Sequence, residues 1–286
     1  MERARHGPVR LPGQLQGAQL TPSGAAALLP AIAAIVGVFG LLIGSFLNVV
    51  IWRVPRGESV VAPPSACPAC GHRIAARDNV PVISWVLLRR RCRHCHAPIS
   101  ARYPLVEAGT AALFVLVALR FGAGWATPAY LFLALVAVAL ALIDLDTHRL
   151  PDVIVLPAYP VGLALLALAS WATGDWGALL RALAGAGVMF VFYFAMLFAY
   201  PAGMGFGDVK LAGLLGLFLG WLGWGSLVVG GFGAFLLGGV FSVALLASGR
   251  ANRKSGIPFG PWMVLGATVG VAVGARIWEG YLYLLA

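Results

Sequence analysis

The sequence predicts an all-α protein that crosses a membrane about eight times. Of its 286 residues, 60% are hydrophobic and only 10% are charged, which is more apolar surface than one water-soluble core can bury. Apolar stretches long enough to span a hydrocarbon core of about 30 Å recur along the chain. One polar segment, which contains all four cysteines, separates the first of these stretches from the others.

The apolar stretches run from Ala27 to the C-terminus, with short polar or Gly/Pro-bearing turns between most of them. The first is too long for the apolar part of a signal peptide, and no small-residue cleavage site follows it, so we expect a membrane helix there. Residues 1–26, rich in Gly, Pro, Gln and Arg, are predicted to be a mobile tail. The predicted helices are 27–51, 104–121, 128–146, 153–172, 178–200, 207–222, 225–248 and 259–284.

The net charge of +10 does not indicate nucleic-acid binding, because the basic residues lie at the ends of the apolar stretches rather than in a basic tail or stripe. The segment 52–103 is rich in arginine and has only Glu58 and Asp78 as acidic residues, which predicts that it is cytoplasmic. Arg250, Arg253 and Lys254 agree with this orientation. Three basic residues of the tail oppose this orientation, namely Arg3, Arg5 and Arg10. They are mostly far from the first helix, and charge affects orientation less at such a distance.

The cysteines form two knuckles, Cys67-Pro-Ala-Cys70 and Cys92-Arg-His-Cys95. Two CxxC turns at this separation let four thiolates converge on Zn²⁺, and a segment of about 50 residues needs such a staple. Two disulfides are the alternative, which a reducing cytoplasm disfavours. Nearby histidines could replace a thiolate, but four cysteines complete a closed, structural site. The segment 52–103 is therefore predicted to be a small zinc-binding domain between the first two membrane helices.

Acidic residues are few, and three of them lie where apolar helices meet the predicted cytoplasmic surface. Asp144 and Asp146 end one helix, and Asp208 begins another. A carboxylate at membrane depth is costly unless it serves a cavity or a partner, which makes these residues functional candidates. The alternative is a solvated residue at a helix end, which fits Asp152 and Asp146.

The motif Gly205-Phe-Gly207-Asp208 strengthens the functional interpretation of the carboxylates. Glycines beside a carboxylate allow unusual dihedral angles and let another extended backbone, such as a peptide substrate, approach closely. Two carboxylates that share a proton can hydrolyse an amide, so we hypothesise a catalytic pair of Asp144 and Asp208. Lys210 is interpreted as a group that tunes Asp208, binds a substrate charge or anchors the helix at the lipid interface.

Other catalytic schemes lack their residues. The chain has no HExxH, GxSxG or Walker A motif, and zinc binding leaves no spare cysteine as a nucleophile. His148, beside Asp146 and an arginine, is interpreted as a solvated loop residue.

At these residues the sequence resembles the type 4 prepilin peptidase family. The resemblance covers nearly the whole chain after the tail, and its blocks occur in the family's order. They are Gly44–Pro55, the two CxxC knuckles, Arg102–Glu107, Asp144 with Leu150–Asp152, Gly205–Asp208 and Ile257–Pro261. The resemblance implies that residues 104–286 form a seven-helix aspartyl protease domain, with Asp144 and Asp208 catalytic and with Gly205, Gly207, Lys210, Asp146 and Asp152 supporting them.

The resemblance also implies an activity and a location. Such an enzyme lies in the bacterial inner membrane and cuts the basic leader from type IV prepilins or type II secretion pseudopilins on the cytoplasmic face. It then N-methylates the new terminus with S-adenosylmethionine. One departure bears on methylation, because Arg90 stands where the family usually has glycine, and a long side chain there could block a cofactor. The alternative is therefore a peptidase without methyltransferase activity.

Two further alternatives compete with this interpretation. A transporter or secretion scaffold would use Asp144 and Asp208 as proton or cation sites, and would predict broken helices in two related halves, which the sequence does not display. A presenilin-like protease would share the GxGD motif but would lack the cysteine segment.

Overall fold

A computed structural model describes residues 22–201, 203–249 and 257–285, with side chains from residue 28 onward. Most of the predicted mobile tail lies outside the described residues, as do its three arginines. Arg250, Arg253 and Lys254 also lie outside them. The predictions of a mobile tail and of an orientation based on these charges therefore stay predictions.

All eight predicted long helices are confirmed within the described residues. The first begins five residues before its predicted start, and the ends of the other seven agree with the prediction to within two residues. The helices are α1 (Pro22–Arg53), α3 (Arg102–Phe121), α4 (Thr127–Thr147), α5 (Asp152–Thr173), α6 (Trp176–Ala199), α7 (Phe206–Leu222), α8 (Trp224–Ala247) and α9 (Gly260–Leu285).

Seven of these helices are long and apolar enough to cross a membrane. The eighth, α7, has 17 residues, at the lower limit of what a span requires. It is also the most enclosed helix, because every residue from Leu211 to Gly220 is buried. Protein rather than lipid therefore surrounds most of α7, and its short length is compatible with a central place in the bundle.

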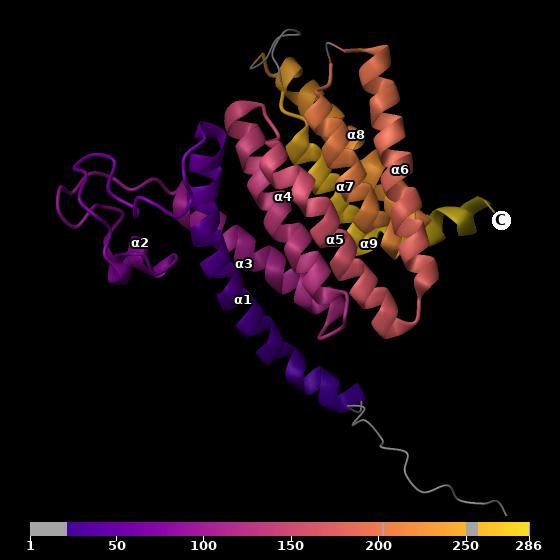
Figure 1. The fold of residues 1–286 in the computed structure, drawn as a ribbon, viewed down its shortest axis with the longest axis horizontal. Coiled ribbons are helices and arrows are strands. Elements are labelled where there is room, and N and C mark those ends of the chain that lie inside the picture. The colour runs from indigo at the N-terminus through magenta and orange to yellow at the C-terminus, as the bar shows by residue number, and fades with distance from the viewer. Residues whose placement is uncertain (1–21, 202, 250–256, 286) are drawn as a thin grey trace, which may run out of the picture.

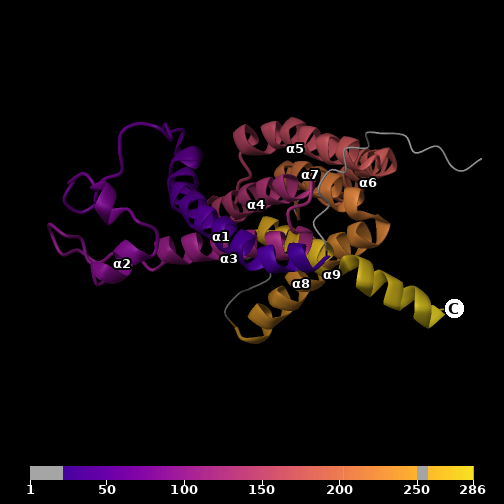
Figure 2. The ribbon, with the colours of Figure 1, turned by 90° about the horizontal axis from the view of Figure 1, so that it is seen from below.

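The helices form two unequal groups. α1 and α3 pack along each other and meet the remaining helices mainly through α4, and they lie to one side of the bundle in Figure 1. α7 contacts α5, α6, α8 and α9. Seen from below, it lies between α5 and α6 on one side and α8 and α9 on the other (Figure 2).

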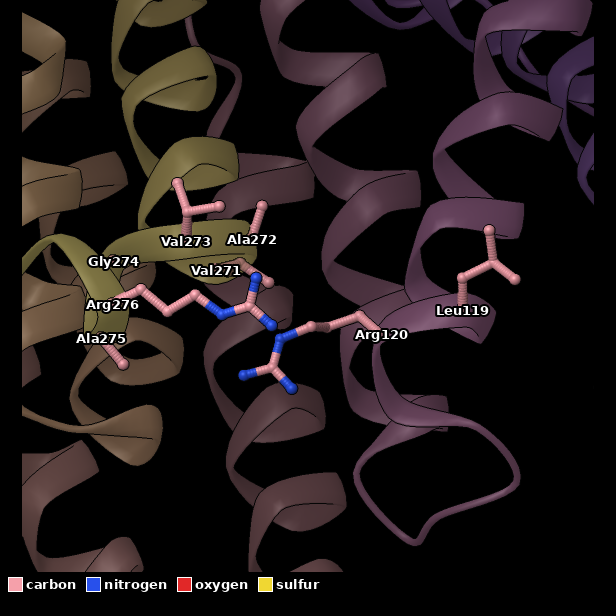
Figure 3. Close-up of a pocket in the computed structure, with 8 residues that line it drawn as sticks. All are labelled: Leu119, Arg120, Val271, Ala272, Val273, Gly274, Ala275 and Arg276. Carbon is pink, nitrogen blue, oxygen red and sulfur yellow. The ribbon is translucent and has the colours of Figure 1, made fainter. Parts of the chain in front are cut away.

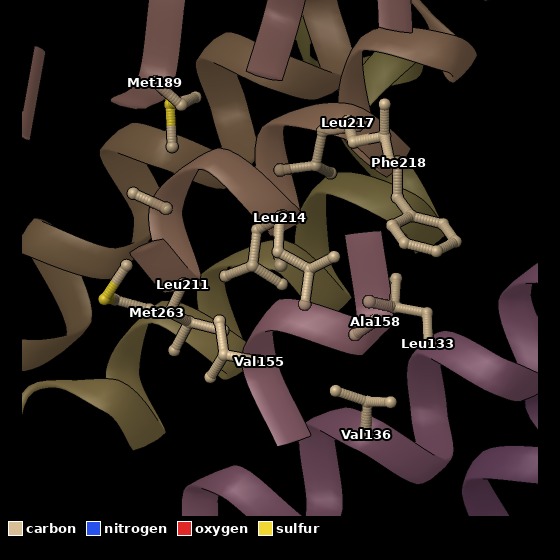
Figure 4. Packing of buried hydrophobic residues seen from close by; sticks show 14 of the residues in the cluster. Leu133, Val136, Val155, Ala158, Met189, Leu211, Leu214, Leu217, Phe218 and Met263 are labelled. Atoms are coloured by element: carbon tan, nitrogen blue, oxygen red, sulfur yellow. The ribbon is translucent and has the colours of Figure 1, made fainter. Parts of the chain in front are cut away.

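Small residues and branched apolar side chains together determine how closely α7 approaches its neighbours. A Cβ atom added at Gly216 would meet the carbonyl oxygen of Gly185 in α6, so these two backbones touch, as small residues allow in membrane bundles. Elsewhere Leu211, Leu214 and Phe218 fill the space between α7 and the helices around it (Figure 4). This packing determines where the first turn of α7, and with it Asp208, lies.

The segment 52–103 extends away from α1 (Figure 1) and has little regular structure. It contains two 3₁₀ turns, η1 (Val54–Arg56) and η2 (Ala76–Asp78), and one short helix, α2 (Ile83–Leu87). The buried carboxylate of Glu107 in α3 accepts a 2.7 Å hydrogen bond from the amide of Val82. Because Glu107 lies more than one turn inside α3, this bond holds the start of α2 against the membrane helices.

Candidate active site and cysteine cluster

Asp144 and Asp208 line the same cavity, of about 450 Å³, at one end of the bundle. The two residues are 64 positions apart, yet α4 ends and α7 begins at this end of the fold. The cavity wall also contains five other residues that the sequence singled out, together with parts of η1 and the loop before α5: Asp152, Gly205, Gly207, Lys210 and His148. The structure thus brings together the predicted carboxylate pair and most of its predicted supporting residues.

Asp144 lies in the last turn of α4, and only 5% of its surface is exposed. His148 ends the helix in a left-handed conformation, with φ of 50°, and its amide donates to the carbonyl of Asp144. The side chain of Asp144 accepts a 2.9 Å hydrogen bond at Oδ2 from the amide of Gly260, the first residue of α9. One oxygen of this carboxylate is therefore held by a helix N-terminus, which leaves the other for chemistry.

Asp208 is the third residue of α7, and its Oδ2 accepts a 3.0 Å hydrogen bond from the amide of Gly205. Neither Gly205 nor Gly207 has a positive φ, so the expectation of unusual dihedral angles at this motif is wrong. A close approach does occur at Gly207, where an added Cβ would lie 3.0 Å from Cβ of Leu150. Glycine here lets α7 begin directly against the loop that precedes α5.

Lys210 does not pair with Asp208. Its ammonium group forms an ion pair with Asp152, the first residue of α5, and lies 4.9 Å from the centre of the Phe206 ring. The geometry therefore does not support the interpretation that Lys210 tunes Asp208 by direct contact. The pair instead links the first turns of α5 and α7, at the wall of the cavity.

Asp146 does not line the cavity that contains Asp144 and Asp208. Both of its oxygens accept hydrogen bonds from the guanidinium of Arg102, at 2.8 and 2.6 Å. This bidentate pair joins the end of α4 to the start of α3. Asp146 therefore connects two helix ends and lies outside the cavity of Asp144 and Asp208.

Sequence reasoning missed Gly260 as a site residue. His148, interpreted as a solvated loop residue, is exposed as expected and also lines the cavity. The signal for Gly260 was present, because Ile257-Pro-Phe-Gly-Pro261 precedes an apolar helix, and the free amides of a helix start are donors for a carboxylate. No local pattern identifies its partner, which lies 116 positions away.

The four cysteines converge. Their Sγ atoms all lie within 4.8 Å of one another, and Sγ of Cys67 is 3.8 Å from that of Cys95. A tetrahedral Zn²⁺ with Zn–S bonds of about 2.3 Å separates its sulfurs by about 3.8 Å. All four cysteines are free thiols, so the disulfide alternative is not what this fold contains. The cluster could hold one metal ion.

The two knuckles have the same backbone pattern at an offset of 25 residues. In the first knuckle, the amide of Cys67 donates to the carbonyl of His72, and the amide of Gly71 donates to the carbonyl of Cys67. In the second knuckle, the amide of Cys92 donates to the carbonyl of Ala97, and the amide of His96 donates to the carbonyl of Cys92.

Two groups in this segment have a lowered pKa. The amides of Cys70 and Ala69 lower the pKa of the Cys67 thiol to about 7. The guanidinium of Arg93, which contacts both oxygens of Asp78, holds the pKa of that carboxyl below its usual value.

Arg90 has a left-handed backbone conformation, with φ of 64°. Its guanidinium lies 5.2 Å from the centre of the Trp85 ring, and its carbonyl accepts a hydrogen bond from Ile99. Glycine adopts positive φ without a Cβ penalty. The backbone geometry at this position therefore accounts for the glycine that the family resemblance implies there, without any contact to a cofactor.

Comparisons with known proteins decide the family. Residues 38–121 match the bacterial peptidase A24 N-terminal domain, and residues 131–243 match the type IV leader peptidase family. A prepilin leader peptidase/N-methyltransferase of Aeromonas hydrophila is 40% identical over 274 residues, which cover 87% of this chain and 93% of that protein. The chain belongs to the type IV leader peptidase family.

Further members of the type IV leader peptidase family match over similar lengths. Proteins of the same description from Pseudomonas aeruginosa and Burkholderia pseudomallei are 36% and 34% identical, over 85% and 83% of this chain and 91% and 84% of their own lengths. No solved structure matches the chain. The two family models divide the chain between its two sites, because the first contains the four cysteines and the second contains both Asp144 and Asp208.

Proposed function

We propose that this chain is an intramembrane aspartyl endopeptidase that removes the leader from type IV prepilins or type II secretion pseudopilins and N-methylates the new terminus. The proposal places it in the bacterial inner membrane, with the cavity facing the cytoplasm. The shared cavity of Asp144 and Asp208 carries the peptidase part. Two carboxylates at the end of an otherwise apolar bundle, beside an opening to the surface, suit the cutting of a peptide at the membrane edge.

The chemistry requires one ionised and one protonated carboxyl group. The ionised group takes a proton from a water molecule, whose oxygen attacks the scissile carbonyl carbon, while the protonated group donates to the carbonyl oxygen. Collapse of the tetrahedral intermediate breaks the C–N bond, and the amine leaves with a proton returned by the pair. The Gly260 amide restrains Oδ2 of Asp144, which keeps the reactive oxygen in place during these transfers.

The cysteine cluster supplies structure to this enzyme rather than chemistry. Cys67, Cys70, Cys92 and Cys95 would hold Zn²⁺ in a closed Cys₄ site, which has no open position for a substrate. S-adenosylmethionine would supply the methyl group, and we assign no residue to its binding. Methyltransferase activity is supported by the description of the relatives as prepilin leader peptidase/N-methyltransferase. Arg90 is compatible with it, because its backbone already has the conformation that glycine would adopt there.

Substitution of the two aspartates tests the peptidase proposal. Asp144→Asn and Asp208→Asn should each abolish leader cleavage, because an asparagine and an aspartate cannot share a proton as two carboxyl groups do. Zinc content and thermal unfolding should stay unchanged. Asp146→Asn, which alters a positioning pair, should keep measurable activity. The assay incubates purified enzyme with prepilin and sequences the product N-terminus. Near-normal processing by the Asp144→Asn/Asp208→Asn double variant would refute the catalytic pair.

Mass spectrometry of the mature pilin tests the methyltransferase part. With S-adenosylmethionine present, the product should be heavier than the cleaved pilin by one methylene unit. A cleaved but unmethylated product from both the wild type and Arg90→Gly, under conditions in which a relative methylates, would leave a peptidase alone.

A further inference from the structure

A second cavity lies at the opposite end of the bundle from the aspartates, between α3 and α9. It has a volume of about 250 Å³, and two arginines dominate its lining. Figure 3 shows the guanidinium groups of Arg120 and Arg276 extended toward one another from these two helices. The fold thus gathers two positive charges, 156 positions apart in sequence, at one small opening.

Among the residues that the structure describes, no carboxylate lies within ion-pair distance of Arg120 or Arg276. Within the described part of the chain, the ion pairs closer than 4 Å involve other residues, and the basic residue paired at this end of the bundle is Arg181, with Asp175. The centre of the Phe121 ring lies 5.2 Å from the guanidinium carbon of Arg120. Two facing cations repel each other, so an anion between them would lower the energy of this arrangement.

The location of the pair indicates which anion can reach it. Arg120 lies in the last turn of α3, the end remote from the cysteine segment, and Arg276 lies roughly 24 Å along α9 from Gly260 at 1.5 Å per residue. Both are therefore near the far edge of a hydrocarbon core about 30 Å thick. Exposed tryptophans, which favour the lipid interface, surround this end of the bundle: Trp125, Trp171, Trp176 and Trp224.

The remaining lining of the cavity is apolar. Leu119 and Val273 are exposed on the outside of the bundle, where lipid chains would contact them, and Val271 packs toward the core. The cavity therefore offers two guanidinium forks at headgroup depth and an apolar wall beside them. This combination matches a molecule with a phosphate and an acyl chain, and guanidinium groups bind phosphate oxygens in a bidentate manner.

We propose that Arg120 and Arg276 form a binding site for the phosphate of an anionic phospholipid, in the leaflet opposite the aspartate cavity. The lipid joins the end of α3 to α9, two helices that belong to the different groups of the fold. Because it links α3 to α9, the bound lipid stabilises the position of the α1–α3 pair against the bundle. Glu107 of α3 also holds the cysteine segment, so the lipid acts on the position of that segment through α3.

The experiment uses the full-length protein in phosphatidylcholine nanodiscs in which phosphatidylglycerol replaces an increasing fraction of the lipid. Thermal unfolding reports binding, because a ligand that binds the folded state raises the unfolding temperature. The Arg120→Gln/Arg276→Gln variant is compared with the wild type and with Arg181→Gln, which removes a cation at the same end but outside the cavity. Prepilin cleavage in pure phosphatidylcholine, expected to be equal in all three, shows that the variants fold. A separate arm adds inorganic phosphate instead of phosphatidylglycerol.

We expect the wild type and Arg181→Gln to reach half of the stabilisation at the same phosphatidylglycerol fraction. The double variant should need at least about ten times more, or fail to respond, since charge-assisted hydrogen bonds are lost. An equal response of the double variant and the wild type would overturn the site. Equal stabilisation by inorganic phosphate would show a soluble-anion site and overturn the lipid assignment. If the double variant misfolds, the Arg120→Lys/Arg276→Lys variant replaces it. If this variant reached half of the stabilisation at the same phosphatidylglycerol fraction as the wild type, bidentate binding by the guanidinium groups would be refuted.

Discussion

The amide of Gly260 donates a 2.9 Å hydrogen bond to Oδ2 of Asp144, and so connects the start of α9 to the end of α4. A Cβ atom added at Gly260 would lie only 2.7 Å from that same oxygen. The hydrogen bond and the lack of a side chain at Gly260 together allow the carboxylate of Asp144 to lie directly against the start of α9.

Gly260→Ala should lower the rate of leader cleavage by roughly 100-fold, because displacement of a reacting group by about 1 Å costs that much. Gly280→Ala is the matched control, since this glycine is on the same helix and an added Cβ there meets nothing within 4 Å. Cleavage rates and thermal unfolding of both variants are the measurements. A Gly260→Ala enzyme with the wild-type rate would show that the seating of Asp144 does not matter for the reaction.

The ion pair between Lys210 and Asp152 should be energetically coupled. In a double-mutant cycle with Lys210→Gln and Asp152→Asn, we expect a coupling free energy of about 0.5–1 kcal/mol in unfolding, since one partner is half-exposed. The pair of Arg181 and Asp175 is the comparison. It should couple less, because its charged atoms are 3.9 Å apart and Arg181 is more exposed than Lys210. Additive effects of the Lys210 and Asp152 substitutions would show that their contact contributes nothing measurable.

Arg90→Gly should stabilise the cysteine segment by about 1 kcal/mol, because glycine removes the Cβ penalty of a positive φ. Arg90→Ala should not stabilise it, since alanine keeps that penalty and loses the contact with the Trp85 ring. Resistance of the segment to proteolysis under increasing urea measures the difference. If alanine and glycine behave alike, the side chain rather than the backbone conformation determines the effect.

Removal of metal should loosen the segment that contains the knuckles and leave the membrane helices folded. Four metal-bound thiolates would take the place of a core in this segment, whereas packing around α7 holds the bundle. We expect one Zn²⁺ per chain by metal analysis, and protease cleavage confined to residues 57–100 after chelation. An absence of zinc, together with thiols that react only after reduction, would favour disulfides and overturn the proposed orientation.

Local properties of the sequence predicted the helices and singled out the candidate residues of both sites. Hydropathy over about 20 residues located every long helix, because a membrane-spanning segment must be apolar along its whole length. The two CxxC turns predicted the cysteine cluster for a similar reason, since the ligand spacing is itself local. The rarity of acidic residues in an apolar chain pointed to Asp144, Asp146 and Asp208, and the glycines before Asp208 then favoured the pair of Asp144 and Asp208.

Only the tertiary structure decided which partner each of these residues has. Asp144 binds Gly260, Asp146 binds Arg102 and Asp152 binds Lys210, at separations of 116, 44 and 58 positions. Hydropathy and spacing do not encode such pairings, because they depend on how the helices pack and on which ends of the bundle they share. The same holds for Arg120 and Arg276, which the sequence presents as two unrelated cations and which the packing of α3 and α9 brings to one cavity.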